Sequence, residues 1–252
     1  MTSEGWRLEL NRRRDLTALF SDSFGVLRRH FWAFLALSAV VVVPVHVIVS
    51  GVGLEQLTGR YDSSPPLAES LIPTAVSFLV VAPLLNAICI HVLRSVADGG
   101  SPGARQAIIQ GFEAFTPIFF AVLLAAAGIA LGLLLFIVPG VYVAVRWFFV
   151  PQAVVIEGAR GPGALAHSME VTNGFWLRTF GIVLVANLAA AVPGLLLSAP
   201  LAALARESGR AVWGLAGTIL TEMVTTPFVA LVATLLYYDL RQRRGGPPKS
   251  VA

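Results

Sequence analysis

The sequence has few charged residues and a single cysteine. Only 13% of its 252 residues are Asp, Glu, Lys or Arg, whereas a typical soluble protein carries about 25%. With 56% hydrophobic residues and a mean hydropathy of +0.78, the chain has too little polar surface to cover a soluble fold. Because Cys89 has no second cysteine to pair with, an internal disulfide and a cysteine-based metal cluster are both excluded. Lipid is therefore the expected solvent for most of the chain.

The short motifs that carry common chemistries are missing as well. The sequence contains no GxxxxGK[ST] phosphate loop, no HExxH zinc motif, no GxSxG nucleophile elbow and no CxxC pair. No pair of carboxylates lies in a polar loop, as an acid–base couple would. His46 and His91 lack a second histidine at i+4 and a nearby carboxylate, so they do not form a metal-binding set. We therefore expect a protein without enzymatic activity, cofactor or metal.

Six apolar runs dominate the sequence. A helix needs about 20 apolar residues to cross the hydrocarbon core of a membrane. Five runs reach this length, and the fourth has only 16 residues, which include Arg146 and Pro151. The predicted spans are 31–53, 71–93, 115–138, 141–156, 176–201 and 212–238, with a polar loop at 54–70, a tight turn at Pro139-Gly140 and a short basic tail at 241–252. The prediction is an all-α, polytopic membrane bundle that forms one integral membrane domain over 1–252.

Arginines predict the orientation of these spans. Of the 18 basic residues, 17 are Arg. If the chain crosses six times from a cytoplasmic N-terminus, 14 basic residues fall on the cytoplasmic side and only Arg60, Arg206 and Arg210 on the outer side. The positive-inside rule favours this arrangement, and it requires the short fourth run to cross. We expect a protein of the bacterial plasma membrane with both termini in the cytoplasm.

Three amphipathic segments precede spans one, three and five. Their apolar residues recur with the i, i+3, i+4, i+7 spacing of one helix face, and aromatic residues follow at Phe31, Phe115 and Phe175. We expect interfacial helices on the cytoplasmic side, with the aromatic rings at headgroup level. The chain then divides into three repeat-like units, 16–98, 101–157 and 162–240, each an interfacial helix followed by a transmembrane hairpin. Alternatively, any helix that enters a bilayer is amphipathic in its first turns.

Two ionisable residues within predicted spans are candidates for a polar site. An ionisable residue inside a span costs about 2.5–3.5 kcal/mol on insertion scales. Counting at 1.5 Å per residue from the outer ends places Arg146 and Glu222 within about 6 Å of each other in depth. We therefore predict an intramembrane ion pair between Arg146 and Glu222. Such a pair either fixes the packing of spans four and six or forms a gate or proton-coupled site.

The segment from Pro139 to Arg178 is PGVYVAVRWFFVPQAVVIEGARGPGALAHSMEVTNGFWLR, and the sixth span closes with LYYDLR. The pattern combines Pro-Gly, an Arg within a short span, Val-x-Glu, a Gly-containing turn, Ala-Leu-x-x-Ser and an aromatic start to the next span. It resembles the membrane domain of glycerophosphoryl diester phosphodiesterases. The matching residues are Arg146, Glu157, Ser168, Asp239 and Arg241, and position 167 is His where that family often has a basic residue.

This resemblance implies a six-span membrane domain. It does not imply phosphodiesterase activity, because the catalytic barrel of those enzymes is a separate soluble domain for which this chain has no residues left. The resemblance therefore bears on architecture, and most stand-alone members of that family have no assigned function.

Three functions are compatible with the sequence. The first is a non-catalytic protein that organises anionic lipid headgroups, or contacts a membrane-protein partner, at the cytoplasmic leaflet. Arginine clusters at 12–14, 28–29 and 241–244 would favour anionic lipid by about 1 kcal/mol per charge, although topology alone explains them. The second is a small transporter or permease subunit with Arg146 and Glu222 in a polar cavity. The third, an intramembrane lipid enzyme, would need a His/carboxylate site. Because the basic residues lie between apolar runs, we expect no nucleic-acid partner.

Overall fold

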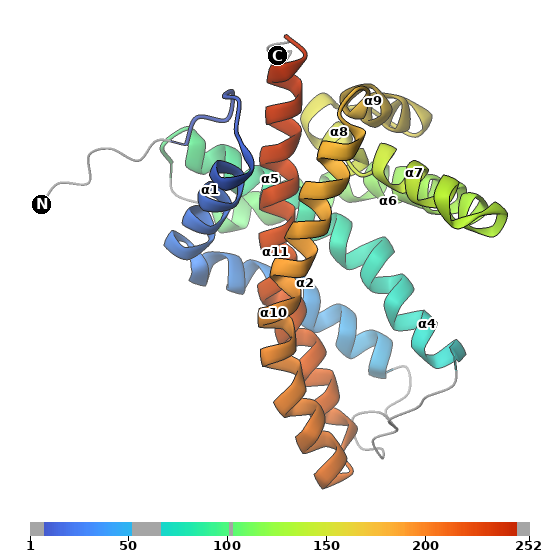
Figure 1. The fold of residues 1–252 in the computed structure, drawn as a ribbon. Helices are drawn as coiled ribbons and strands as arrows, with labels where there is room; N and C mark the ends of the chain where they lie inside the picture. Colours follow the sequence, from blue (N-terminus) through green and yellow to red (C-terminus); the bar gives the residue numbers. More distant parts are fainter. Residues whose placement is uncertain (1–7, 52–66, 101–102, 246–252) are drawn as a thin grey trace, which may run out of the picture.

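In a computed structural model, the chain consists of helices that fan out from one end (Figure 1). The structure describes residues 8–51, 67–100 and 103–245, so most of the predicted loop at 54–70 and most of the tail at 241–252 lie outside the described residues. The helical segments are α1 Leu16–Arg29, α2 Phe31–Gly51, α4 Leu67–Val76, the π-helix η1 Ser77–Val81, α5 Ala82–Ala97, α6 Ala104–Leu135, α7 Ile137–Arg146, α8 Val150–Glu157, α9 Pro162–Thr172, α10 Trp176–Ser208 and α11 Ala211–Arg243. The described residues contain no β-strand, which confirms the all-α prediction.

Six stretches are long and apolar enough to cross a membrane. They are Phe31–Val49, Leu71–Ala97, Ala104–Leu135, Ile137–Glu157, Trp176–Ser208 and Ala211–Arg243. Their mean hydropathy runs from 1.4 to 2.8, and the lowest value belongs to the fourth. This confirms the prediction of six spans and makes the chain a multipass membrane protein. Several helices extend beyond the predicted ends because their polar flanking residues continue the helical backbone past the apolar run.

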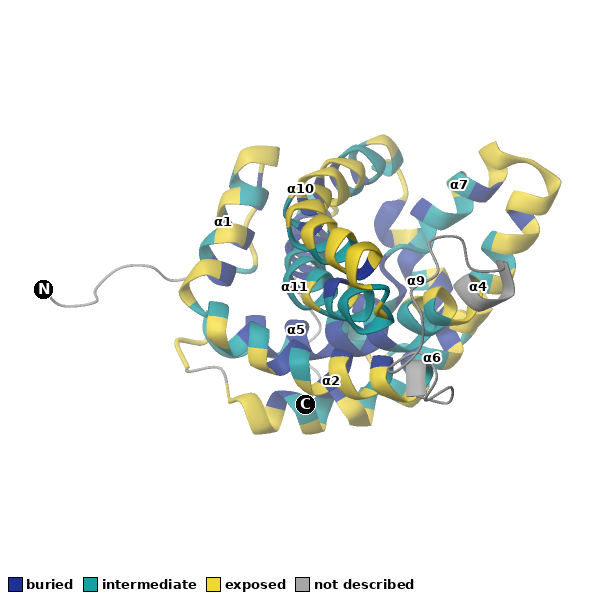
Figure 2. Cartoon of the chain, turned by 90° about the horizontal axis from the view of Figure 1, so that it is seen from below, coloured by how far each residue is buried: buried dark blue, intermediate teal, exposed yellow. Residues whose placement is uncertain are grey.

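The helices meet at the end that carries the C-terminus and diverge away from it (Figure 1). Helices α10 and α11 form one long antiparallel hairpin, and α6 and α7 form a second hairpin that points away from the first. The largest cluster of buried residues includes the last part of α11, α5 and the middle of α2. Figure 2 shows these buried segments at the centre and exposed residues along α1, α10 and the tip of the α6–α7 hairpin. The bundle is therefore tightly packed at one end and splayed at the other.

Two of the three predicted interfacial helices are separate helices. Helix α1 ends before His30, and α9 is followed by a turn at Asn173–Gly174 in which Gly174 has a φ of 78°. The amphipathic segment at 104–112 instead continues without a break into span three as part of α6. This segment has no glycine with positive φ to end the helix, and Pro117 is accommodated within it. The second repeat-like unit thus lacks the separate interfacial helix that we predicted.

The turn between spans three and four lies at Phe136, so the prediction of a turn at Pro139-Gly140 is wrong. Phe136 is extended, with φ −162° and ψ 153°, and α7 begins at the next residue. Pro139 lies in the first turn of α7, where a backbone amide has no helical carbonyl to donate to. The amide proton that proline lacks therefore costs the helix no hydrogen bond. Gly140 allows α7 to approach α6 closely, because a Cβ atom there would lie 2.7 Å from the backbone nitrogen of Leu133.

Span four is broken between α7 and α8. Helix α7 ends at Arg146, α8 begins at Val150, and the intervening residues form a turn. Ser168 of α9 bonds to both sides of the break: its hydroxyl donates to the Arg146 carbonyl at 2.8 Å and accepts from the Phe149 amide at 3.1 Å. Backbone groups within a membrane must find partners inside the protein. The Ser168 side chain therefore makes an interruption at this depth tolerable.

Replacing Ser168 by alanine tests this account. We expect Ser168→Ala to lower the free energy of unfolding by about 1–3 kcal/mol, because the buried Phe149 amide and the part-buried Arg146 carbonyl each lose a partner. Thermal unfolding in detergent measures the effect. Ser23→Ala is the matched control, since Ser23 is equally buried but donates only to the Leu19 carbonyl of its own helix, at 2.7 Å. Equal shifts for the two variants would contradict the role assigned to Ser168.

Candidate functional site

The Asp239 carboxylate is fully buried at the C-terminal end of the bundle and is surrounded by donors. Its Oδ1 accepts from the backbone amide of Arg14 at 2.7 Å. Its Oδ2 accepts from Nη2 of Arg178 at 3.0 Å and from Nε of Arg243 at 2.9 Å. A buried carboxylate stays charged only where such donors replace water. The segment before α1, the first turn of α10 and the last turn of α11 are thereby joined.

The Arg14 side chain is buried in the same network. Its Nε donates to Asp22 at 2.9 Å, and its Nη1 donates to the Leu10 carbonyl at 3.1 Å. Burial lowers the pKa of Arg14 and the hydrogen bond to Asp22 opposes this shift, and a guanidinium remains protonated in either case. Arg12 also pairs with Asp22, at 2.7 Å. Two of the three arginines at 12–14, where we expected lipid contacts, are thus bonded within the protein.

Glu157, at the end of α8, forms a second ion pair at this end of the bundle. It pairs with Arg241 and accepts a hydrogen bond from the Tyr237 hydroxyl at 3.1 Å. His167 Nε2 lies 3.9 Å from the same carboxylate. We refer to the charged residues of the two clusters together as the ion-pair layer: Arg12, Arg14, Asp22, Glu157, Arg178, Asp239, Arg241 and Arg243. The sequence-pattern residues Glu157, Asp239 and Arg241 all belong to it.

The structure does not bring Arg146 and Glu222 together. The Oε2 atom of Glu222 lies 2.9 Å from Nε2 of His46, which is buried in α2. The guanidinium of Arg146 instead lies over the Tyr142 ring, 5.9 Å from its centre. The depth count assumed that spans four and six run side by side. In the structure α7 packs on α6, whereas the Glu222 side of α11 meets α2, so the predicted pair is wrong.

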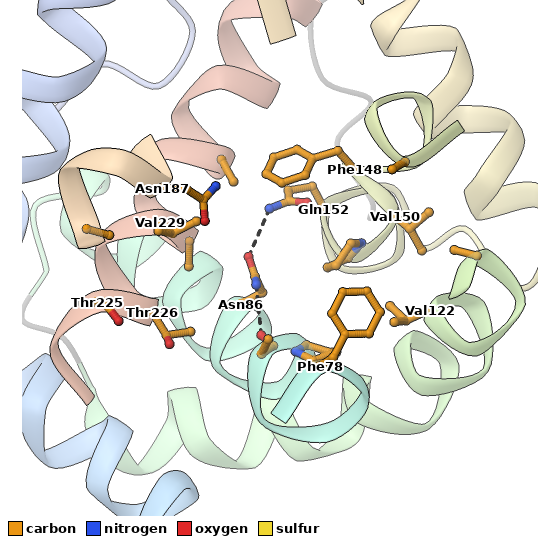
Figure 3. Close-up of a pocket in the computed structure, with 18 of the residues that line it drawn as sticks. Phe78, Asn86, Val122, Phe148, Val150, Gln152, Asn187, Thr225, Thr226 and Val229 are labelled. Atoms are coloured by element: carbon orange, nitrogen blue, oxygen red, sulfur yellow. Dashed lines mark hydrogen bonds between the residues drawn. The ribbon is translucent and has the colours of Figure 1, made fainter. Parts of the chain in front are cut away.

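A cavity of about 730 Å³ lies between the α10–α11 hairpin and the wall formed by η1, α5, α6 and the α7–α8 break (Figure 3). Its inner end is formed by fully buried residues such as Val150 and Ala230. Its mouth lies between Leu195 of α10 and Phe78 of η1, which line the cavity yet are 66% and 53% exposed. Because other exposed apolar side chains of α10, such as Leu188, surround Leu195, the cavity opens sideways toward lipid.

The ion-pair layer lies directly beyond the inner end of this cavity. Ala233 lines the cavity, and one helical turn later Tyr237 bonds to Glu157. The Tyr237 ring also packs edge-on against Phe149, with their centres 5.6 Å apart. Buried rings and charged pairs therefore separate the cavity from the C-terminal end of the bundle.

The described residues that line the cavity include no Asp, Glu, Lys, Arg or His. Its polar residues are Asn86, Trp147, Gln152, Asn187, Ser198, Thr221, Thr225 and Thr226. Gln152 is 1% exposed and donates through Nε2 to Asn86 Oδ1 at 3.3 Å (Figure 3). The Oε1 atom of Gln152 and the indole nitrogen of Trp147 have no partner among the described residues. Both atoms are themselves buried and so are not exposed to the open cavity, and each lacks the partner that a buried polar group normally has.

Breaks and small residues in the surrounding helices create this space. The interruption of span four supplies Trp147, and α8, which follows it, supplies Gln152. Gly128 of α6 makes room for the indole, since a Cβ atom there would lie only 2.6 Å from Cη2 of the Trp147 ring. The wider turn of η1 carries Phe78 at the mouth, and such π-segments often occur at functional sites.

Asn86, Gln152 and Asn187 are not among the residues predicted from the sequence. Ionisable residues are the first candidates for a polar site within a span, because they cost most in a membrane. Each of the three is an uncharged amide inside an apolar run. A search for amides within spans would have found them, although the sequence alone does not show that they face one cavity.

The role of Asp239 is testable by Asp239→Asn. Asn keeps one acceptor oxygen but loses the charge, so we expect a loss of about 3 kcal/mol, the low end for breaking a buried pair. The unfolding midpoint in detergent should fall, and trypsin should cleave faster after Arg13, which is exposed beside the buried Arg14. Glu170→Gln is the control, because Glu170 is 68% exposed. Unchanged cleavage at Arg13 in Asp239→Asn would contradict the anchoring of this segment.

Comparison with known proteins identifies a family but no close relative. No curated protein matches the chain, and no solved structure matches it. The family described as a domain of unknown function, DUF7847, matches residues 67–240. The match runs from the start of α4 to Leu240 of α11, so it includes Asp239 and every residue that lines the cavity. Since the match covers more than half of the chain, the protein belongs to the DUF7847 family.

Proposed function

We propose that this protein is a non-catalytic membrane protein that binds an amphiphilic lipid in the cavity between α10–α11 and the α5–α8 wall. The observation that carries the proposal is the cavity itself: about 730 Å³, sealed at one end and open sideways among exposed apolar side chains. This volume lies within the range of about 300–1,000 Å³ that is usual for ligand sites. A lipid could enter from the bilayer without passing through water.

The composition of the cavity supports binding rather than catalysis. Its described lining offers no ionisable side chain to act as a general acid, a general base or a carboxylate nucleophile. Among the described residues, no three His, Cys, Asp or Glu side chains form a group that could hold a metal ion. The proposal therefore needs no cofactor.

We further propose that the protein lies in the bacterial plasma membrane with both termini in the cytoplasm. The excess of basic residues on one side, 14 against three, supports this orientation. The ion-pair layer would then face the cytoplasm. Exposed Phe24, Arg28 and Trp32 near this layer are the types of residue that anchor a protein among anionic headgroups. We also propose that the chain is related to the membrane domain of glycerophosphoryl diester phosphodiesterases. Two residues of the shared pattern, Glu157 and Asp239, belong to the ion-pair layer, which supports this relationship.

A transporter or permease subunit is the second candidate. The observation that favours it is the pair of irregular segments in the cavity wall, η1 and the α7–α8 break. Interrupted helices line the substrate sites of many transporters. In this version the cavity would carry its ligand between the leaflets, and the polar contacts would come from the cavity amides instead of Arg146 and Glu222.

Filling the mouth of the cavity tests lipid binding. Ala191 lines the cavity and is exposed, so Ala191→Trp should place an indole in the mouth without disturbing the core. We expect the affinity of the cavity for lipid to fall by roughly tenfold, because forcing extra side-chain atoms into an occupied space costs about 1–3 kcal/mol. Native mass spectrometry of the purified protein measures the lipid that remains. Ala203→Trp, on an exposed part of α10 outside the cavity, is the control. Equal lipid retention in both variants would count against the cavity as the site.

Cysteine labelling tests the orientation. In a Cys89→Ser background, Ser63→Cys in the predicted outer loop should react with a membrane-impermeant maleimide in intact spheroplasts. Ser250→Cys in the tail should react only after lysis, because six crossings return the chain to the side of its N-terminus. Labelling of Ser250→Cys before lysis would mean that the chain has the opposite orientation or crosses the membrane one time fewer. Either result would contradict the proposed topology.

A further inference from the structure

We infer that Arg146 binds the phosphate of an anionic phospholipid at the junction of α7 and α10. The feature that carries the inference is a guanidinium without a carboxylate partner among the described residues, held at the end of a stack of aromatic rings beside the ion-pair layer. Arg146 is not among the described residues that line the cavity. The inference therefore adds a second lipid site to the proposed function and does not depend on the first.

The charge of Arg146 has no counter-ion in the part of the chain that the structure describes. The arginines of the ion-pair layer pair with Asp22, Glu157 or Asp239. No ion pair of the described residues includes Arg146, whose guanidinium lies over the Tyr142 ring at 5.9 Å. A charge at the edge of the hydrocarbon is costly unless an opposite charge lies close by. An anion that reaches this guanidinium would therefore be stabilised.

Stacked rings and two backbone contacts fix the position of the guanidinium. Tyr142 stacks on Trp176 with the ring centres 5.8 Å apart, and Trp176 stacks on Phe180 at 5.4 Å. The Trp176 indole nitrogen donates to the Tyr142 carbonyl at 3.2 Å, and Ser168 donates to the Arg146 carbonyl at 2.8 Å. A ring attracts the face of a guanidinium, whereas a phosphate binds the N–H groups at its edge. The ring contact therefore leaves these donors to a phosphate and holds the side chain in place before the lipid arrives.

The stack lies at the depth of lipid headgroups. Trp176 begins α10, and Arg178, two residues later, belongs to the ion-pair layer. Two residues advance a helix by about 3 Å, so the rings and the charged end of the bundle share one level. Trp and Tyr side chains favour this boundary between headgroups and hydrocarbon. Next to the rings on α10, Leu177 and Leu184 are exposed and offer an apolar surface to acyl chains.

The site favours a lipid with a net negative charge. In phosphatidylcholine the ammonium group balances the phosphate and would be repelled by the guanidinium, whereas phosphatidylglycerol leaves its phosphate charge to Arg146. One basic residue near the membrane surface favours anionic lipid by about fivefold, and the planar guanidinium can bind two phosphate oxygens at once. Inorganic phosphate offers the same oxygens but has no acyl chains to contact the exposed leucines of α10. An anionic phospholipid therefore fits this junction better than a free anion.

The test uses two lipids with the same acyl chains. The full-length protein is placed in nanodiscs with equal amounts of dioleoyl phosphatidylcholine and dioleoyl phosphatidylglycerol, and bound lipid is measured by native mass spectrometry. We expect phosphatidylglycerol to be enriched on the unaltered protein and Arg146→Gln to reduce this enrichment about fivefold. Arg105→Gln is the matched control, because it removes the same charge from an exposed arginine at the start of α6. Equal reductions in the two variants would mean a general effect of surface charge and would overturn the inference.

Two measurements do not depend on how Arg146→Gln folds. Equal binding of the two lipids to the unaltered protein would overturn the inference, and so would displacement of phosphatidylglycerol by millimolar inorganic phosphate, which would identify a free anion as the ligand. The cavity variant Ala191→Trp separates the two lipid sites, because Ala191 lines the cavity and Arg146 does not. We expect Ala191→Trp to keep the full enrichment of phosphatidylglycerol. Loss of the enrichment in this variant would assign the anionic lipid to the cavity and overturn the second site, whereas failure at Arg146 leaves lipid binding in the cavity intact.

Discussion

The tightly packed end of the bundle, which carries the C-terminus, depends on the contacts of the buried Asp239 carboxylate. Water cannot reach it, so its charge is balanced by groups that the chain itself brings together. The backbone of Arg14 participates twice, because its amide donates to Asp239 while its carbonyl accepts from Arg178 at 2.6 Å and from Arg243 at 2.8 Å. One carboxylate and the backbone of one residue thus organise two arginines, and three segments distant in sequence end up in fixed positions.

The splayed end follows from the nature of the solvent. In water, apolar walls such as those of the cavity would collapse onto each other, but lipid tails are as apolar as leucine and exert no such force. Helix association in lipid relies on close packing and polar contacts. Both are found where α6 meets α7 through Gly132 and Gly140, and where α10 and α11 meet through Thr221 and Gly194. Among the described residues, the two hairpins are joined at one place by the Trp176 indole, which donates to the Tyr142 carbonyl at 3.2 Å, and elsewhere the space between them stays open.

Hydropathy was sufficient to predict the six spans, because each apolar run needs a lipid environment regardless of its neighbours. The sequence pattern also predicted Glu157, Ser168, Asp239 and Arg241, and the structure places all four at the tightly packed end of the bundle. The pairing of Arg146 with Glu222 failed because depth along a helix says nothing about which helix stands opposite. The turn at Pro139-Gly140 failed because proline and glycine also suit the first turn of a helix that packs closely.

The cavity could not be derived from the sequence for a related reason. Asn86 and Gln152 lie 66 positions apart, and whether they meet depends on the tilt of three helices and on the break after Arg146. Local patterns determine elements, whereas the angle between two hairpins is set by a few contacts at their common end. The polar lining is visible in the sequence only as isolated amides.

The contact between Arg14 and Asp239 also has a consequence for biosynthesis. The two residues are 225 positions apart, so the ribosome must add all of these positions after Arg14 before Asp239 becomes available. Until then Arg14 remains at the membrane surface without Asp239, and the earlier hairpins insert before this contact can join them. Closure of the bundle is therefore a late event in its assembly, and a nascent chain that stops before the last helical turn would leave its first segment open to proteases.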